Sequence, residues 1–195
     1  VGGEILYQGE NLLEKNKDQM RKIRGGEIAM IFQEPMTALN PVFTVGDQIA
    51  ETLMLHEGLE RRAAWGRAEG LLAEVGIPEP AIRVRNYPFE LSGGMRQRVM
   101  IAIALACNPK LLLADEPTGA LDSHTGREVL GMLQDLHGQG HTVVLITHDN
   151  SIAVQADRII RLEDGQVVYD GDSRAPEAIV QPTLNFEPAE QEGNK

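Results

Sequence analysis

The sequence has little of several residue types, and each shortage excludes a class of protein. Cys107 is the only cysteine among 195 residues, so a disulfide framework is excluded and nothing indicates an oxidising compartment. Positive charge is scarce, since 18 Lys and Arg residues stand against 29 Asp and Glu residues and the net charge is −11. A balance this acidic argues against a nucleic-acid binder. No apolar run approaches the roughly 20 residues of a membrane span, and we expect neither a span nor a signal peptide.

The chain does contain enough apolar material for a core, at 42% of its residues. Compact apolar runs predict buried strands at residues 28–32, 111–114 and 142–146. Helical periodicity and capping residues predict helices at residues 45–55, 61–75, 92–107 and 125–137. Strands that alternate with helices indicate an α/β fold with a parallel sheet, and the all-helical stretch from residue 43 to 106 interrupts this alternation. We therefore predict an α/β core with a helical insert.

The remaining segments are shorter or more polar. We expect one short strand at residues 2–9, a short helix at 11–22, a loop at 33–41 and a hairpin around Asp164 and Gly165. Beyond Gly171, Pro, Glu, Gln, Asn and Gly predominate, which predicts a disordered acidic tail. The chain then divides into four parts: the first part of the core (residues 1–42), the helical subdomain (43–106), the rest of the core (107–171) and the tail (172–195).

The strongest local motif is the apolar strand with two carboxylates at its end, LLLADEP at residues 111–117. Open α/β sheets place their ligands at the carboxyl ends of strands, where Asp115 and Glu116 stand. In a nucleotide hydrolase the first carboxylate holds Mg²⁺ and the second polarises the attacking water, and both must be firmly positioned. Taken alone, an exposed acidic turn after a strand explains these residues equally well.

Two further motifs are weaker when each is taken alone. Ser92, Gly93 and Gly94 begin a predicted helix, where exposed backbone N–H groups and a hydroxyl can form an anion site. A plain helix cap with glycines for close packing is the better interpretation of this motif by itself. His148 follows the predicted strand at residues 142–146 and could reach a phosphate, but a surface histidine is the simpler reading.

The order of the motifs is far more specific than any one of them. Along the chain come IFQEP at residues 31–35, LSGG at 91–94, LADEP at 113–117, ALD at 120–122 and THD at 147–149. This set resembles the nucleotide-binding subunit of an ABC transporter, from Gly2 to about Gly171. The resemblance implies a P-loop NTPase-like parallel sheet with an all-helical insert that carries the signature motif. It also implies ATP and Mg²⁺ as cofactors.

For the core, the resemblance implies one role per motif. Gln33 would be the Q-loop glutamine, which touches Mg²⁺ and the attacking water and links the core to the helical insert. Asp115 would be the Walker B aspartate that serves the metal, and Glu116 the catalytic base. His148 would be the switch histidine on the γ-phosphate.

Other motifs would act on a partner's nucleotide. Ser92, Gly93 and Gly94 would be the signature motif that binds the γ-phosphate held by the opposite subunit, and Asp122 would belong to the D-loop at the dimer interface. Two subunits would close head to tail around two ATP molecules. The implied partners are a second ABC ATPase subunit, identical or different, transmembrane permease subunits and a solute-binding protein. The implied location is peripheral, on the cytoplasmic face of the inner (plasma) membrane, and no nucleic acid is expected.

The sequence departs from this family in one important respect, because Gly-x-x-x-x-Gly-Lys-[Ser/Thr] is absent from it. That phosphate loop, with its strand and helix, would precede the segment around Gly3 in this family. Because the first residue is Val1, we expect an N-terminally truncated subunit rather than a degenerate one. Loss of a central strand would expose the edges of the strands at residues 111–114 and 142–146.

The type of transporter is less uniformly indicated. Residues 2–107 resemble dipeptide, oligopeptide and nickel importers, while residues after Glu116 look more like macrolide-export and lipoprotein-release subunits. Gly119 stands where importers usually have a second Thr. We favour peptide import, with an export-type ATPase as one alternative. Others are a non-catalytic subunit that lends its signature motif to a competent partner, and a non-transport ABC ATPase acting on DNA or ribosomes.

Overall fold

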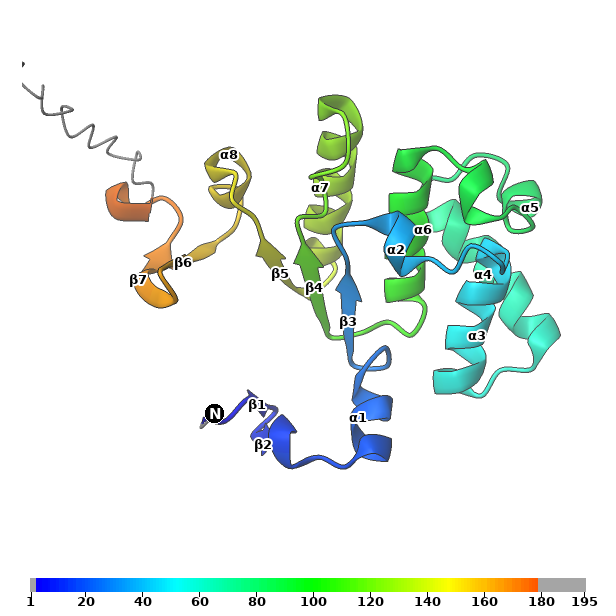
Figure 1. The fold of residues 1–195 in the computed structure, drawn as a ribbon, viewed down its shortest axis with the longest axis horizontal. Helices are drawn as coiled ribbons and strands as arrows, with labels where there is room; N and C mark the ends of the chain where they lie inside the picture. The colour runs from blue at the N-terminus through cyan, green and yellow to red at the C-terminus, as the bar shows by residue number, and fades with distance from the viewer. Residues whose placement is uncertain (1–2, 179–195) are drawn as a thin grey trace, which may run out of the picture. The chain divides into compact units, whose positions relative to one another are not determined.

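The computed structural model describes residues 3–178, which form two units (Figure 1). The first unit runs to Ile146 and contains a parallel sheet and a group of helices. The second begins at Thr147 and contains a short helix and a hairpin. The sequence predicts a tail at residues 172–195, and the part of it from residue 179 onward lies outside the described residues.

Three parallel strands form the sheet of the first unit, in the order β3 (Ile28–Ile31), β4 (Leu111–Asp115) and β5 (Thr142–Ile146). Ile28 pairs with Leu111, and Leu111 with Thr142, so the strands begin nearly level. All three positions and the parallel arrangement agree with the sequence prediction. Because the strands run in one direction, their carboxyl ends lie along one edge of the sheet.

Burial differs between the strands, and one edge of β5 has no partner in the described sheet, as the sequence predicts for the strand at residues 142–146. Leu112 and Ala114 of β4 are fully buried, whereas Val144 and Ile146 of β5 are 43% and 50% exposed. The prediction of a buried strand at residues 142–146 is therefore wrong, because β5 has a neighbour on one side only within the described sheet. The predicted free edge of β4 is also wrong, since β3 and β5 pair with it on both sides.

The helical insert packs beside β3 (Figure 1). Its long helices are α3 (Val45–Glu57), α4 (Arg61–Glu74) and α6 (Gly93–Leu105), with the short α5 (Pro80–Arg83) and the 3₁₀ turn η2 (Pro88–Glu90) between the last two. Thr44 caps α3 through its side chain, and Gly58 ends that helix with a φ of +67°. Buried aliphatic side chains of α3, α4 and α6 belong to the same hydrophobic core as buried side chains of the sheet. Examples from the helices are Ile49, Leu72 and Ile101.

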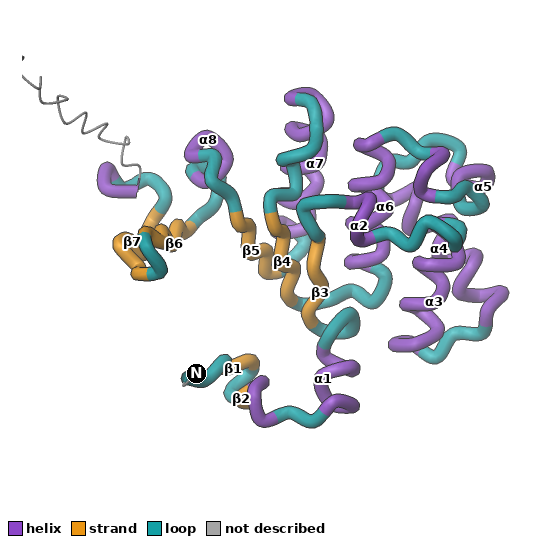
Figure 2. Tube along the Cα trace, viewed as in Figure 1, coloured by secondary structure: helices purple, strands orange, loops and turns teal. Residues whose placement is uncertain are grey.

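Two helices flank the carboxyl edge of the sheet. The segment predicted as a loop at residues 33–41 contains a single helical turn, α2 (Pro35–Ala38), because Pro35 stands at its first position, where proline is tolerated. Helix α7 (Ser123–Gly138) begins two residues before the predicted start, because Asp122 caps it. Figure 2 shows α7 between the strand ends and the helical group.

The N-terminal segment is less regular than predicted. In place of a single strand at residues 2–9 there are two short antiparallel strands, β1 (Leu6–Tyr7) and β2 (Glu10–Asn11), joined by a turn that contains Gly9. The 3₁₀ turn η1 (Leu12–Glu14) and helix α1 (Lys17–Ile23) follow. Asn16 and Gln19 form a reciprocal capping box that starts α1, so the predicted helix is split in two.

The second unit consists of α8 (Asn150–Ala153), the strands β6 (Arg158–Glu163) and β7 (Gln166–Asp172), and the 3₁₀ turn η3 (Pro176–Ala178). The predicted hairpin is confirmed: Asp164 and Gly165 have φ values of +48° and +77°, as a two-residue turn with both residues left-handed requires. Within residues 3–178, no helix combines the length and the apolar character that crossing a membrane requires.

Candidate functional site

Asp115 and Glu116 stand where β4 ends at the carboxyl edge of the sheet. Asp115 is the last residue of the strand, and both residues are partly buried. The backbone N–H of Glu116 donates to the Ile146 carbonyl at 3.0 Å, which ties the end of β4 to the end of β5. Glu116 has a φ of +42°, a left-handed conformation that non-glycine residues rarely adopt. The fold therefore holds a strained carboxylate at this edge, as functional sites often do.

Gln33 approaches the same turn from β3. A Cβ placed on Gly119 would lie 3.7 Å from the Gln33 Nε2 and 3.7 Å from the Glu116 Cβ, so the two side chains border one glycine. The Gly119 N–H donates to the Glu116 carbonyl at 3.0 Å and closes the turn. The structure thus places Gln33 and Glu116, both predicted from the sequence, around Gly119, directly after Asp115 at the end of β4.

The N-terminus of α6 carries the Ser-Gly-Gly motif. The Ser92 hydroxyl oxygen accepts from the Met95 N–H at 3.3 Å, and the hydroxyl keeps its own hydrogen for another acceptor. A Cβ on Gly93 would make only an ordinary contact, 3.9 Å from the Arg96 Nη2, whereas a Cβ on Gly94 would lie 2.5 Å from the Thr125 Cγ2. Gly94 must therefore be glycine for packing, while Gly93 leaves room at a helix end that attracts anions.

Asp122 organises the N-terminus of α7. Its carboxylate accepts from the backbone N–H groups of His124 and Thr125, both at 3.0 Å, and from the Thr125 hydroxyl at 2.7 Å. These bonds, chiefly the one from the Thr125 N–H, lower the pKa of Asp122 below its usual value. Thr125 therefore connects Asp122 with Gly94, and the two predicted motifs lie side by side.

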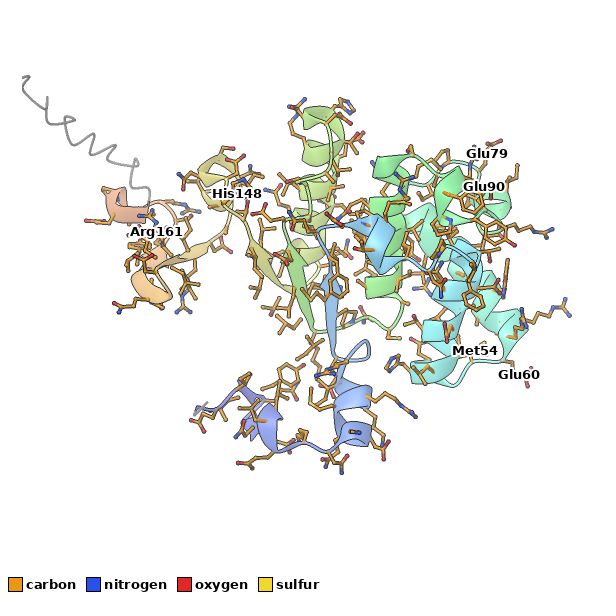
Figure 3. All side chains as sticks on the ribbon, in the orientation of Figure 1. Met54, Glu60, Glu79, Glu90, His148 and Arg161 are labelled. Carbon is orange, nitrogen blue, oxygen red and sulfur yellow. The ribbon has the colours of Figure 1, made fainter. Side chains whose placement is uncertain are left out.

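His148 belongs to the second unit, next to α8, and is labelled in Figure 3. Its side chain is exposed. The neighbouring Asp149 caps α8, and the hydrogen bond from the Ser151 hydroxyl, followed by the one from the Ser151 N–H, lowers the pKa of Asp149. The structure places His148 at the exit of β5 but does not relate it to Glu116.

Thr125 and Arg98 are two residues of this region that the sequence interpretation did not select. Thr125 fills the space above Gly94, and Arg98 donates to both the Val75 carbonyl and Glu128. The spacing Asp122-x-x-Thr125 is a capping pattern and would have been the signal for Thr125. For Arg98 the position four residues after Gly94 was the available signal, because it lies on the same helix face.

The side chains at the sheet edge suit a hard cation. Carboxylates of Asp115 and Glu116 and the carboxamide of Gln33 are oxygen donors of the kind that Mg²⁺ prefers. Within residues 3–178, no three or more His, Cys, Asp or Glu side chains converge as a metal cage. Mg²⁺ usually takes one or two carboxylates and shares the rest of its shell with water and phosphate, so these residues fit such an ion. The arrangement is that of an α/β protein with polar side chains at the carboxyl ends of parallel strands.

Comparison with known proteins identifies the family. The family described as ABC transporter matches residues 1–119, and the chain therefore belongs to the ABC transporter family. The oligopeptide transport ATP-binding protein OppD of Bacillus subtilis is 50% identical over 171 residues, which are 87% of this chain and 48% of that protein. The dipeptide transport ATP-binding protein DppD of Escherichia coli is 47% identical over 174 residues, 88% of this chain and 53% of that protein.

A solved structure shows the same fold. The dimeric, post-hydrolysis structure of the ATP-binding cassette MJ0796, bound to ADP and Pi, superposes with a TM-score of 0.78 at 34% identity. The match covers 89% of this chain and 75% of that one. The chain spans about half the length of the curated relatives named above. Similarity to the proteins named for peptide transport extends well past Glu116, since it covers 87–88% of the chain.

Proposed function

We propose that this chain is the ATP-binding subunit of an ABC importer for peptide-like solutes, with ATP and Mg²⁺ as cofactors. The observation that carries the proposal is that Gln33 and the strained Glu116 both border Gly119, just beyond the end of β4. The names of the relatives support the peptide-like solute, since OppD and DppD are described as oligopeptide and dipeptide transport proteins. An export-type ATPase remains the alternative.

Each residue at the sheet edge has a proposed task. Bound Mg-ATP supplies the terminal phosphoryl group and the diphosphate leaving group. Asp115, fixed by strand pairing, would hold the metal together with Gln33. Glu116 would accept a proton from the attacking water. Its left-handed backbone conformation sets the direction in which the side chain leaves the turn. The role proposed for His148, from the resemblance alone, is that of the switch histidine on the γ-phosphate.

Ser92, Gly93 and Gly94 are proposed to bind the nucleotide of a second ABC ATPase subunit, across an interface that includes Asp122. The N-terminus of α6 offers backbone N–H groups and the positive end of a helix dipole, both suited to a phosphate. The dimeric form of the cassette MJ0796 supports this arrangement.

Exposed apolar side chains suggest where permease subunits dock. Val42 and Phe43, just before α3, are 71% and 50% exposed, and Phe89 is 63% exposed beside Tyr87, whose ring stacks on it with centroids 5.5 Å apart. The Val45 N–H donates to the Asn86 carbonyl at 2.9 Å and fixes the two segments together. Such a patch fits an apolar segment of a permease. The subunit would then lie on the cytoplasmic face of the membrane, and a solute-binding protein would complete the system.

The proposed organisation keeps the predicted parts: core segments at residues 1–42 and 107–171, with the helical subdomain at 43–106 between them. We infer that the sheet is a P-loop NTPase-like core that lacks the phosphate-loop strand within these 195 residues. The chain is therefore proposed not to hydrolyse ATP by itself.

The test uses Gly93, where a Cβ would meet no atom closer than ordinary contact distance. Gly93→Asp adds a charge without a steric clash, because the nearest side-chain atom to a new Cβ is the Arg96 Nη2 at 3.9 Å. A negative charge about 4 Å from a phosphate charge costs about 4 kcal/mol at an effective dielectric constant near 20. We expect Gly93→Asp to abolish Mg-ATP-dependent association with a second ABC ATPase subunit that has a phosphate loop and a Gln in place of its catalytic glutamate.

The matched control is Gly93→Asn, which has the same shape without the charge and should retain most of the association. Gly94→Asp is less informative, because it also clashes with Thr125. Sedimentation of the mixture with and without Mg-ATP measures the effect. If Gly93→Asp associates as the unaltered chain does, the signature assignment and the proposed function are wrong.

A further inference from the structure

Helices α6 and α7 contact each other at two points with matching spacing. At the first point a Cβ on Gly94 would lie 2.5 Å from the Thr125 Cγ2. At the second point the Arg98 Nη2 donates to the Glu128 Oε2 at 2.9 Å. The second point follows the first by one turn on each helix, so the helices run in the same direction where they touch. Both N-termini therefore lie at the same end of the contact.

Arg98 also reaches a third helix. Its Nη1 donates to the Val75 carbonyl at 2.8 Å, where α4 ends. The following residue, Gly76, has a φ of +72°, and a Cβ there would lie 2.8 Å from the same Nη1. The guanidinium side chain is 17% exposed. A glycine in a left-handed conformation thus makes room for an arginine of α6 that bonds to the end of α4 and to Glu128 of α7.

The two contact points are not equivalent in strength. Gly94 and Thr125 meet through van der Waals contact only, so they set how closely the helices approach. The bond between Arg98 and Glu128 is charge-assisted and directional, so it resists sliding and rotation. Glu128 also faces His124, whose Nδ1 lies 3.8 Å from the other carboxylate oxygen.

We infer that Arg98 is a positioning residue: with Glu128 as its partner, it holds the Ser92–Gly94 loop in register with the Asp122 turn. The inference rests on the proposed function, in which both segments face a second subunit across bound nucleotide. The Asp122 turn is already rigid through Thr125, so fixing α6 against α7 fixes the two segments together. A shift of α6 along α7 would separate them and weaken nucleotide-dependent closure.

The experiment measures the Mg-ATP concentration for half-maximal association with the second ABC ATPase subunit described above. Arg98→Gln and Glu128→Gln should each raise this concentration about tenfold, as expected for loss of a hydrogen bond between charged groups. The double variant should resemble Arg98→Gln, because that variant already lacks the bond to Glu128 as well as the bond to the Val75 carbonyl. Arg98→Lys keeps the charge without the two-pronged geometry and should lie between Arg98→Gln and the unaltered chain.

The matched control is Arg67→Gln, which removes an ion pair with Glu74 on the exposed side of α4 at 2.7 Å. This control should leave the half-maximal concentration unchanged. Urea unfolding of each chain alone reports any merely structural effect. The inference is overturned if Arg98→Gln lowers the unfolding midpoint without changing the Mg-ATP concentration, or if the two single effects multiply in the double variant. The proposed function itself fails only if Gly93→Asp also leaves association intact.

Discussion

Glu116 combines a proposed catalytic role with a backbone conformation that disfavours its own side chain. A φ of +42° places its Cβ close to the backbone, a strain on the order of 1 kcal/mol. Glycine has no Cβ and adopts this conformation readily. The strain is thus located at the residue where the chemistry is proposed to occur.

We expect Glu116→Gly to be more stable than Glu116→Ala by about 1 kcal/mol in the free energy of unfolding, despite the greater flexibility of glycine in the unfolded chain. Urea unfolding at low protein concentration measures the difference. Both variants lack the carboxylate, so they differ only in the backbone effect. A more stable Glu116→Ala variant would show that the positive φ carries no strain.

Asp122 gives stability a dependence on pH at the start of α7. Since its pKa is lowered in the folded state from the usual 3.8, its contribution is fully present above pH 3.8. That contribution is lost as the pH falls through the lower, folded value. Asn caps helices as well as Asp does but does not titrate here.

Acidification from about pH 5 to pH 3 should therefore destabilise the unaltered chain more than Asp122→Asn. Thermal unfolding of the two chains across this range is the measurement. Asp149 and Asp170 also have lowered pKa values and titrate in both chains, so only the difference reports on Asp122. Parallel pH profiles would contradict the assignment.

Among the elements, β5 is the one whose surroundings differ most from its sequence pattern. Its apolar residues suit a central strand, yet alternate positions are exposed, and one side of the strand has no partner in the described sheet. Unpaired apolar strands associate with other chains. Lys is a common residue on such edges because a charge opposes pairing.

Val144→Lys should slow aggregation of the isolated chain, because it puts a charge at an exposed position in the middle of β5. The control is Val144→Thr, which keeps the branched shape and adds no charge. Light scattering over time at fixed concentration distinguishes them. Equal rates for Val144→Lys and Val144→Thr would exclude β5 as the aggregating edge.

Sequence patterns located the three parallel strands and the long helices because apolar runs and caps are local signals. The apolar run at residues 142–146 wrongly predicted a buried strand, because the burial of β5 depends on what lies beside it, whereas the absence of a neighbouring strand correctly predicted its exposed edge. Sequence patterns also missed α2, because a four-residue helix has no periodicity to detect. At the site, the approach of Gln33 to Glu116 follows from the parallel register of β3 and β4. The packing of Gly94 on Thr125 could not be predicted, because it depends on the angle between α6 and α7, which no local pattern gives.

For the whole molecule, we expect the isolated 195-residue chain to hydrolyse ATP no faster than background. The phosphate loop would supply several donors, and each such donor is worth about 10²–10³ in rate. Steady-state phosphate release is the measurement, with Glu116→Gln as the control for contaminating ATPases. Turnover that this substitution abolishes would contradict the expectation.

The pairing of β3 with β4 also imposes an order of events on folding. Ile28 must meet Leu111, so the whole helical subdomain lies within the loop that this pairing closes. Closing a long loop is entropically slow, whereas α3 and α4 follow each other closely and can pack early. We therefore expect the helical subdomain to pack before β3 pairs with β4, and Gln33 to approach Gly119 and Glu116 late in folding.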